Sequence, residues 1–202
     1  MKYKRFKNIE IDNYLGVSPV GKDTFLMAEK AAKLIKNSAL EIGSGTGFIT
    51  TYLAKLGYKC SGVDINPLAI FSSKRNAKKN NLKINYYESN LFSNVKGRYE
   101  LLIFNPPYGN SNSKYITVLI EIVKSLLPKE NKRLAIFSFK YIKAKRRELI
   151  RKFLFQSKRH LNPKGKILIY LHPSEFDLFA PGKVKKLGAY LDLDLVLLSR
   201  LS

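Results

Sequence analysis

The chain has 202 residues, and 45% of them are hydrophobic, which is enough for one domain with a substantial core. Every apolar run is well short of the roughly 20 residues that a membrane-spanning helix needs. The N-terminus is basic but leads into a polar segment rather than the apolar core of a signal peptide. These features argue against a membrane or secreted protein and predict a cytoplasmic one.

The formal net charge is +22, from 37 lysine and arginine residues against 15 aspartate and glutamate residues. Such a charge attracts polyanions over long range and makes a nucleic acid or ribonucleoprotein a candidate partner. Lysine outnumbers arginine, however, and basic runs such as 143–147 and 183–186 equally fit solvated helix faces. The lone Cys60 fits a strand residue, and His160 and His172 have no cysteine or carboxylate at metal-ligand spacing. The sequence therefore predicts no disulfide and no metal site.

Helices and strands alternate in the first half of the chain, as the spacing of apolar residues indicates. In chain order, the predicted elements are a helix (23–36) capped by Asp23 or Thr24, a strand (39–42), a helix (48–56), a strand (59–64), a helix (67–80) and two strands (83–88 and 99–104). The last strand is hydrophobic enough to be covered on both faces, as in the middle of a parallel sheet. This order predicts an α/β fold with one doubly wound, mostly parallel sheet.

The second half of the chain is less regular. Helices are predicted over 114–127 and 146–161, and strands over 134–139, 167–171 and 191–198. Either 134–139 or 167–171 can be the fifth parallel strand, and 191–198 then closes the sheet.

No linker or composition break divides the chain. We therefore expect a single domain over 1–202. It would consist of an N-terminal segment and helix (1–36), a cofactor-binding half (37–109) and a substrate-side half (110–202).

A glycine-rich turn follows the strand 39–42. Gly43, Gly45 and Gly47 let the backbone turn sharply and approach a ligand at positions where any Cβ would intrude. Their Gly-x-Gly-x-Gly spacing differs from the Gly-x-Gly-x-x-Gly pattern of dinucleotide binders, which disfavours a dehydrogenase. Glu41 precedes the first glycine by two residues and can face a ligand that carries an ammonium group.

Two further strand ends carry candidate ligand-binding residues. Asp64 follows the first glycine by roughly 20 residues, where a carboxylate can accept both ribose hydroxyls of a nucleoside. The alternative role for Asp64 is to cap the next helix. After the third strand, Asn90 can contact an adenine edge while Leu91 or Phe92 covers the ring, although asparagine is also common in plain turns.

The tetrapeptide Asn105-Pro106-Pro107-Tyr108 directly follows the hydrophobic strand 99–104. An amide or arylamine nitrogen is a poor nucleophile because its lone pair is delocalised, so its two hydrogens must be held and its lone pair aimed. The Asn105 side-chain oxygen and the Pro106 carbonyl can accept those hydrogens, Pro107 stiffens the loop, and Tyr108 can pack flat on a planar substrate. The tetrapeptide therefore favours methyl transfer to nitrogen by positioning and electrostatic preorganisation, over a role in which Pro-Pro merely ends a strand.

Together, the segments 41–47, 89–92 and 105–108 and the residue Asp64 resemble the successive motifs of class I S-adenosylmethionine-dependent N-methyltransferases. The resemblance covers about residues 19–109. It implies a Rossmann-like domain with a mostly parallel seven-stranded sheet, S-adenosylmethionine as cofactor, and 105–108 as the catalytic residues. The cofactor-binding residues that it implies are Thr24, Glu41, Gly43, Gly45, Gly47, Asp64, Ile65, Asn90, Leu91 and Asn105.

The segment 18–26 is similar to the Pro-x-x-Asp-Thr-Phe-Leu segment of compact HemK-like protein-glutamine methyltransferases, which modify the Gly-Gly-Gln loop of release factors. The chain departs from that family at Lys22, where an acidic residue is common, at Asn90, where an Asp is usual, and over 109–113, where an Asp-Gly-Gly-like segment is absent. The favoured function is methyl transfer to a protein glutamine. The alternatives are transfer to an adenine or guanine exocyclic amine of RNA or DNA, and a nucleotide- or RNA-binding module without catalysis. An activator subunit is a further candidate partner.

Overall fold

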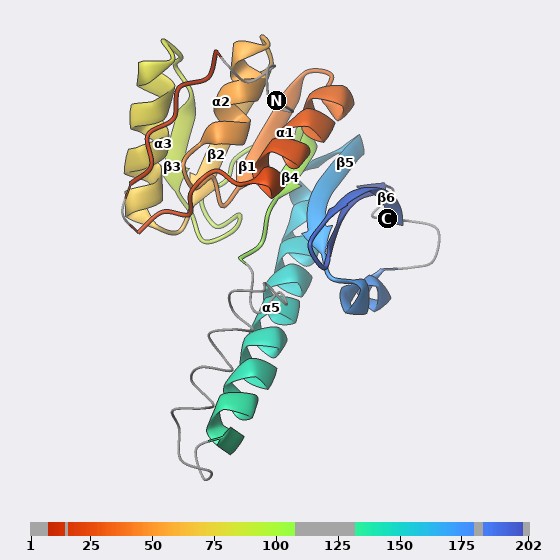
Figure 1. Ribbon diagram of the computed structural model, residues 1–202. Coiled ribbons are helices and arrows are strands. Elements are labelled where there is room, and N and C mark those ends of the chain that lie inside the picture. Colours follow the sequence, from red (N-terminus) through yellow and green to blue (C-terminus); the bar gives the residue numbers. More distant parts are fainter. Residues whose placement is uncertain (1–7, 15, 108–131, 180–183, 200–202) are drawn as a thin grey trace.

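The computed structural model describes residues 8–14, 16–107, 132–179 and 184–199, with 132–144 described by their backbone alone. The helices are α1 (Lys22–Leu34), α2 (Phe48–Lys55), α3 (Pro67–Lys79), α5 (Lys132–His160) and a 3₁₀ helix, η3 (Pro173–Leu178). The strands are β1 (Ser38–Ile42), β2 (Lys59–Asp64), β3 (Asn85–Glu88), β4 (Tyr99–Phe104), β5 (Leu161–Leu171), β6 (Val184–Tyr190) and β7 (Leu193–Ser199). Figure 1 shows how these elements are arranged.

The strands form one seven-stranded sheet in the order β3-β2-β1-β4-β5-β7-β6. Neighbouring strands from β3 to β5 are parallel, whereas β7 is antiparallel to both β5 and β6. The predicted α/β fold with a mostly parallel, seven-stranded sheet is confirmed. Because the carboxyl ends of parallel strands meet at one edge, the residues after β1, β2, β3 and β4 lie along the same border of the sheet.

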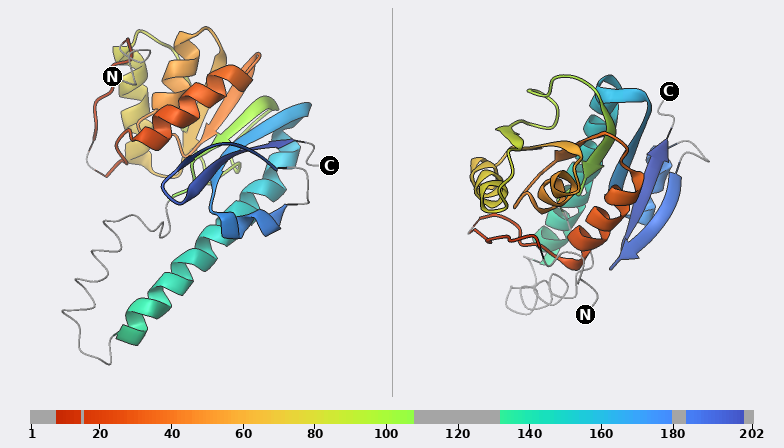
Figure 2. Two further views of the ribbon diagram at one scale, coloured as in Figure 1. Left: turned by 45° about the vertical axis from the view of Figure 1, so that its right-hand side comes forward. Right: turned by 90° about the horizontal axis from the view of Figure 1, so that it is seen from above.

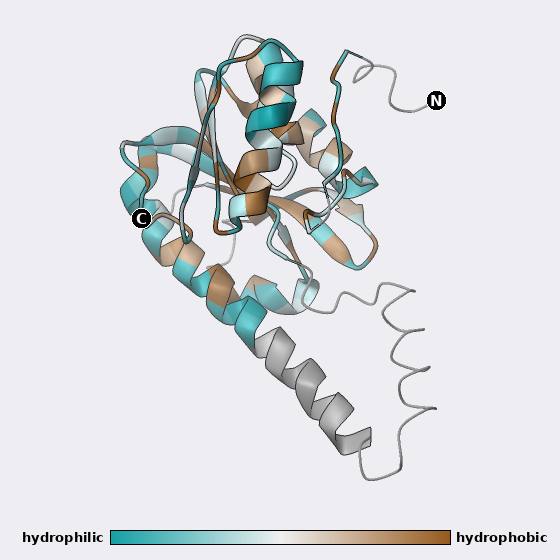
Figure 3. Ribbon diagram, turned by 90° about the vertical axis from the view of Figure 1, so that its left-hand side faces the viewer, coloured by the Kyte–Doolittle hydropathy of each residue, from teal (hydrophilic) through white to brown (hydrophobic). Residues whose placement is uncertain are grey.

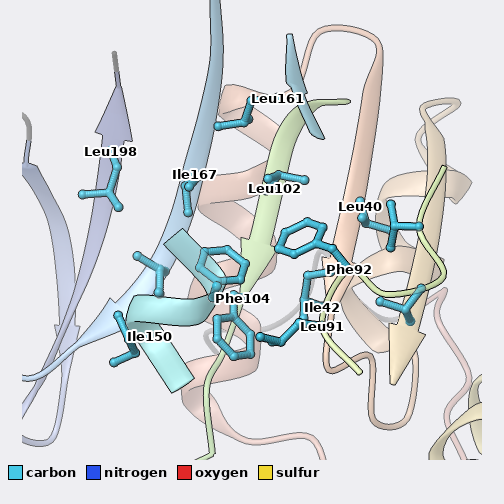
Figure 4. Packing of buried hydrophobic residues seen from close by; sticks show 14 of the residues in the cluster. Leu40, Ile42, Leu91, Phe92, Leu102, Phe104, Ile150, Leu161, Ile167 and Leu198 are labelled. Atoms are coloured by element: carbon cyan, nitrogen blue, oxygen red, sulfur yellow. The ribbon is translucent and has the colours of Figure 1, made fainter. Parts of the chain in front are cut away.

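The two faces of the sheet carry separate hydrophobic clusters. Leu101 and Ile103 of β4 pack with residues of α1 and α2 in one cluster, and Leu102 and Phe104 pack with Ile150 and other residues of α5 in the second. Figure 2 shows α1 and α2 on one side of the sheet and α5 crossing the other side, and Figure 4 shows the packing in the second cluster. Strand β4 is therefore covered on both faces, as its hydrophobic sequence predicts.

The fifth parallel strand is β5, which contains the predicted strand 167–171 and pairs with β4. The alternative, a strand over 134–139, is wrong, since these residues belong to α5. A short apolar run is ambiguous between a strand and a buried helix. Here it lies inside a stretch, 132–160, that contains no glycine or proline to interrupt a helix.

Three smaller differences concern element ends. Helix α1 begins after Gly21 rather than with a cap at Asp23 or Thr24. The basic run 183–186 enters strand β6 rather than a helix, and the predicted helix 114–127 lies outside the described residues. Among the described residues, no helix is long and apolar enough to cross a membrane.

Candidate functional site

The glycine-rich turn leaves β1 at the border where the strand ends meet. Gly43, Gly45 and Gly47 have φ angles of 71°, 53° and 77°, a left-handed conformation that glycine adopts without steric cost. The N–H groups of Gly43 and Ser44 donate to the Val63 carbonyl at 2.8 and 2.9 Å, which fixes the turn to β2. A Cβ at Gly45 would meet no atom within 4 Å, so the space beside this backbone is open to a ligand.

The turn is supported from below by Tyr86 of β3, which was not among the residues predicted from the sequence. The Tyr86 side chain is 2% exposed, and its hydroxyl donates to the Gly47 carbonyl at 3.1 Å. A Cβ at Gly62 would lie 2.5 Å from the Tyr86 ring, and one at Gly47 would lie 2.8 Å from its hydroxyl. Both glycines are therefore needed for the ring to fit, and the cross-strand pairing of Gly62 with Tyr86 is the pattern that could have revealed it.

Glu41 lies beneath the first turn of α2 and is 5% exposed. One carboxyl oxygen accepts hydrogen bonds from the Thr50 hydroxyl and, at 3.0 Å, from the Thr50 N–H. This N–H belongs to a helix start, where backbone donors lack partners within the helix. Burial raises the pKa of Glu41 to about 8. A cationic group of a ligand beside Glu41 would lower this pKa and favour the ionised carboxylate. The predicted contact with an ammonium group stays a prediction.

Asp64 lies beside the glycine turn. Its two carboxyl oxygens accept from the N–H groups of Gly45 at 3.0 Å and Asn66 at 2.9 Å, which orients the carboxylate and leaves further lone pairs on both oxygens. The cap of α3 is Asn66, whose side chain accepts from the Leu68 N–H at 3.0 Å. The capping role considered for Asp64 is therefore filled by another residue. Ile65, the next residue, is 61% exposed at the same border.

The residues after β3 are placed less directly at this border. The Asn90 side chain is exposed, and the Asn90 N–H donates to the Ser93 hydroxyl at 3.2 Å. Leu91 and Phe92 are 8% and 4% exposed and pack in the cluster beneath α5. Their predicted contacts with an adenine ring stay predictions.

The Asn105 amide after β4 has a partner for its nitrogen but none for its oxygen among the described residues. Its nitrogen donates to an Asp23 carboxyl oxygen at 2.8 Å, and the Asp23 backbone carbonyl accepts from the Tyr170 hydroxyl at 3.1 Å. The amide oxygen is buried and has no hydrogen-bond partner among the described residues. A buried acceptor without a partner is costly, and this one fits a donor supplied by a ligand.

Arg146 of α5 fixes the backbone of the two prolines. Its side chain is buried, and all five of its N–H donors are used. Two go to the carbonyls of Pro106 at 3.1 Å and Pro107 at 2.9 Å, one to the Tyr170 carbonyl at 3.0 Å, and two to the Glu175 carboxylate at 2.8 and 3.3 Å. This network ties the corner after β4 to α5, β5 and η3. We call Asn105, Pro106 and Pro107 with these supports the β4 corner.

The remaining candidates have other places. The Thr24 hydroxyl accepts from the Gly21 N–H at 3.3 Å and thus belongs to the start of α1, and Tyr108 lies outside the described residues. Cys60 is a strand residue whose pKa is raised by burial to about 12, which fits an inert thiol. The described residues contain no group of three or more side chains that could hold a metal ion.

The family model described as "Methyltransferase small domain" matches residues 18–134. A provisionally named protein N5-glutamine methyltransferase of Methanocaldococcus jannaschii is 46% identical over 87 residues, which make up 43% of this chain and 44% of the relative. Ribosomal RNA small subunit methyltransferase C of Buchnera aphidicola subsp. Cinara cedri is 37% identical over 107 residues, or 50% of this chain and 31% of the relative. The matched segments thus span less than half of either relative.

Solved structures share the fold at low sequence identity. A methyltransferase of Pyrococcus furiosus has a TM-score of 0.65 at 18% identity, with 97% of this chain and 91% of that chain covered. The Thermus thermophilus 16S rRNA N2 G1207 methyltransferase, in complex with AdoMet and guanosine, has a TM-score of 0.62 at 15% identity, with 92% of this chain and 45% of that chain covered. The family and the fold confirm the predicted Rossmann-like methyltransferase class and its cofactor, S-adenosylmethionine.

Proposed function

Since the chain belongs to the methyltransferase small domain family, we propose that it transfers a methyl group from S-adenosylmethionine to a planar NH2 nitrogen, with a protein glutamine as the favoured acceptor. The observation that carries this proposal is the Asn105 amide. Asp23 holds its nitrogen, and its buried oxygen is an acceptor without a partner among the described residues. A planar NH2 group brings the hydrogens that such an acceptor requires.

The Pro106 carbonyl is the second acceptor for the substrate nitrogen. It already accepts one hydrogen bond from Arg146, and a carbonyl oxygen has two lone pairs. One lone pair therefore remains for a substrate N–H. With both hydrogens held, the nitrogen lone pair is left to attack, and the contribution of the protein is orientation rather than proton abstraction before attack.

The fit of the cofactor rests on the turn and on Asp64. The open space beside Gly45 admits a ligand against the backbone, and the Asp64 carboxylate is held there with lone pairs to spare. We assign the methionine part to Glu41 and the turn, the ribose to Asp64, and the adenine to Ile65, Asn90 and Leu91. When bound, S-adenosylmethionine supplies an electrophilic methyl group.

Two observations support glutamine over a nucleic-acid base as the acceptor. The relative at 46% identity carries the glutamine name, and Asp23, from the segment that resembles HemK-like enzymes, contacts Asn105 directly. An adenine or guanine amine of RNA or DNA is the second candidate, favoured by the relatives named as rRNA methyltransferases and by the net charge of +22. We further propose a single domain over 1–202, a cytoplasmic location, and an activator subunit as a candidate partner.

Incubation with radiolabelled S-adenosylmethionine and separated protein, RNA and DNA fractions tests the proposal. We expect label in protein, loss of label with Asn105→Ala at unchanged cofactor affinity, and weaker cofactor binding with Asp64→Ala. Asn94→Ala, which removes an amide from the β3–β4 loop, is the matched control. Label in RNA or DNA would favour the second candidate, whereas cofactor binding with no transfer to any fraction would establish a binding module.

A further inference from the structure

The described second half of α5 has a buried face and an exposed face. Arg146, Ile150, Phe153 and Ser157 are buried at helical spacing and face the sheet. Phe155 lies between them in sequence but on the other side of the helix, and it is 71% exposed. Figure 3 shows hydrophilic and hydrophobic residues alternating along this part of α5.

Basic side chains surround the exposed ring on all four neighbouring helix positions. Residues three and four positions away are the surface neighbours of a helical residue. For Phe155 these are Arg151, Lys152, Lys158 and Arg159, and all four are exposed. Glu148 is the only acidic residue between 145 and 160, and it pairs with Lys152 at 2.7 Å. Asp177 of η3, which pairs with Arg147, also interacts with Arg151. The four cations outnumber these two carboxylates, so the surface around the ring has a net positive charge.

The Phe155 ring also lacks the cover that another exposed phenylalanine has. Phe71 on α3 is 54% exposed, but Tyr14 packs edge-on against its ring and Arg75 lies over it at 6.0 Å. Phe155 has no ring or cation contact among the described residues. Phe155 is not part of the second hydrophobic cluster, which α5 contacts through Ile150 and Phe153. An open aromatic face inside a ring of cations is the arrangement that stacks an unpaired base and holds the adjoining phosphates.

We propose that this surface, the α5 patch (Arg151, Lys152, Phe155, Lys158 and Arg159), binds single-stranded RNA, with a base stacked on Phe155 and phosphates on the four cations. Charge complementarity selects a polyanion, and the open ring selects one with planar, unstacked groups. Loops and bulges of RNA present unstacked bases, whereas duplexes keep theirs inside the stack. An acidic protein segment would use the cations but leave the ring without a partner.

The α5 patch is separate from the β4 corner. Phe155 lies nine residues after Arg146, which is about 13 Å along the helix axis and half a turn around it. RNA bound at the patch would therefore leave the corner free and would dock the enzyme on an RNA or ribonucleoprotein. RNA binding at the patch does not depend on which nitrogen is methylated, and a measurement of RNA affinity tests it without a transfer assay.

Fluorescence anisotropy of the full chain with a labelled 12-nucleotide oligouridine, over a series of salt concentrations, tests the patch. Phe155→Ala should weaken binding by about tenfold, since stacking contributes about 1–3 kcal/mol per base, and Phe155→Tyr should retain it. Arg151→Ala with Arg159→Ala should lower the slope of log affinity against log salt by about 1.4, or about 0.7 per lost phosphate contact.

The matched control is Lys74→Ala with Lys78→Ala, which removes the same charge from exposed positions on α3. Binding within about twofold of the parent chain is expected for this control, because two distant charges add only a screened contribution. Equal affinity of the parent chain and Phe155→Ala would overturn the inference. So would a control that weakens binding as much as the patch variant, and so would equal binding of poly-glutamate that also depends on Phe155, because that result would indicate a protein partner.

Discussion

Replacing Arg146 by methionine is the most informative perturbation of the β4 corner. The substitution keeps an unbranched side chain as far as the position of the arginine Nε and removes the guanidinium with its five hydrogen bonds. The carbonyls of Pro106 and Pro107 lose their donor from α5. The Glu175 side chain is 4% exposed. Of the hydrogen bonds described for its carboxylate, only the one from the His172 N–H, at 2.8 Å, remains.

The expected loss of stability comes mainly from the Glu175 carboxylate, which stays buried without its cationic partner. Removing one partner of a buried ion pair costs about 3–5 kcal/mol, a large share of the about 5–15 kcal/mol that stabilises a typical domain. The double variant, Arg146→Met with Glu175→Gln, removes the unpaired charge while the glutamine oxygen can still accept from His172. We expect it to regain much of the lost stability, with about 1–3 kcal/mol still missing for the unsatisfied carbonyls.

Activity and stability should separate in this double variant. With the two prolines no longer held, transfer should fall by about 100-fold, the effect of an error of about 1 Å in the placement of reacting groups. Cofactor affinity should stay unchanged, because the turn and Asp64 do not contact Arg146. Urea unfolding, calorimetric titration with S-adenosylmethionine and radiolabelled methyl transfer measure the three quantities. A folded double variant that transfers at the parent rate would refute the positioning role of Arg146.

Three further outcomes follow from other parts of the site. Asp23→Asn should release the Asn105 amide from its charged partner and lower transfer at least tenfold in the radiolabel assay, with cofactor affinity unchanged in the titration. Glu41 contributes stability that is fully present below about pH 4.5 and is lost as the pH rises through its raised pKa of about 8. In Glu41→Gln, the free energy of unfolding measured by urea titration should therefore fall less between pH 5 and pH 8 than in the parent chain. Gly45→Ala should lower the free energy of unfolding by about 1–2 kcal/mol, because the φ angle at this position is 53°. The same variant should also weaken cofactor binding, because the added Cβ enters the open space beside the turn.

The parallel half of the sheet could be predicted because its elements alternate and their apolar runs are unambiguous. The bounds predicted for β2 and β4 match the structure, and the glycine turn meets Asp64 because adjacent parallel strands end at one border. The second half of the chain was harder to predict. The segment 134–139 has the composition of a buried strand or a helix, and the lysines near the start of β6 mask an edge strand, where lysine is common.

The supports of the β4 corner could not be predicted from local patterns, because they come from distant parts of the chain. Arg146 is 40 positions from Pro106 and 29 from Glu175 in the sequence. One local feature does point to it. Arg146 falls four residues before Ile150 and seven before Phe153, on the apolar stripe of α5, and an arginine on a buried stripe needs acceptors for all its donors.

The convergence of these supports explains how a corner with few side chains of its own can be rigid. Prolines cannot donate backbone hydrogen bonds, so Pro106 and Pro107 can be held only through their carbonyls. Arg146 supplies both donors, while Asp23 holds the neighbouring amide and Tyr170 links the two supports through its carbonyl and its hydroxyl. Because methyl transfer to a delocalised nitrogen depends on alignment, a change in Arg146 or Asp23 should lower turnover more than it changes affinity for the cofactor.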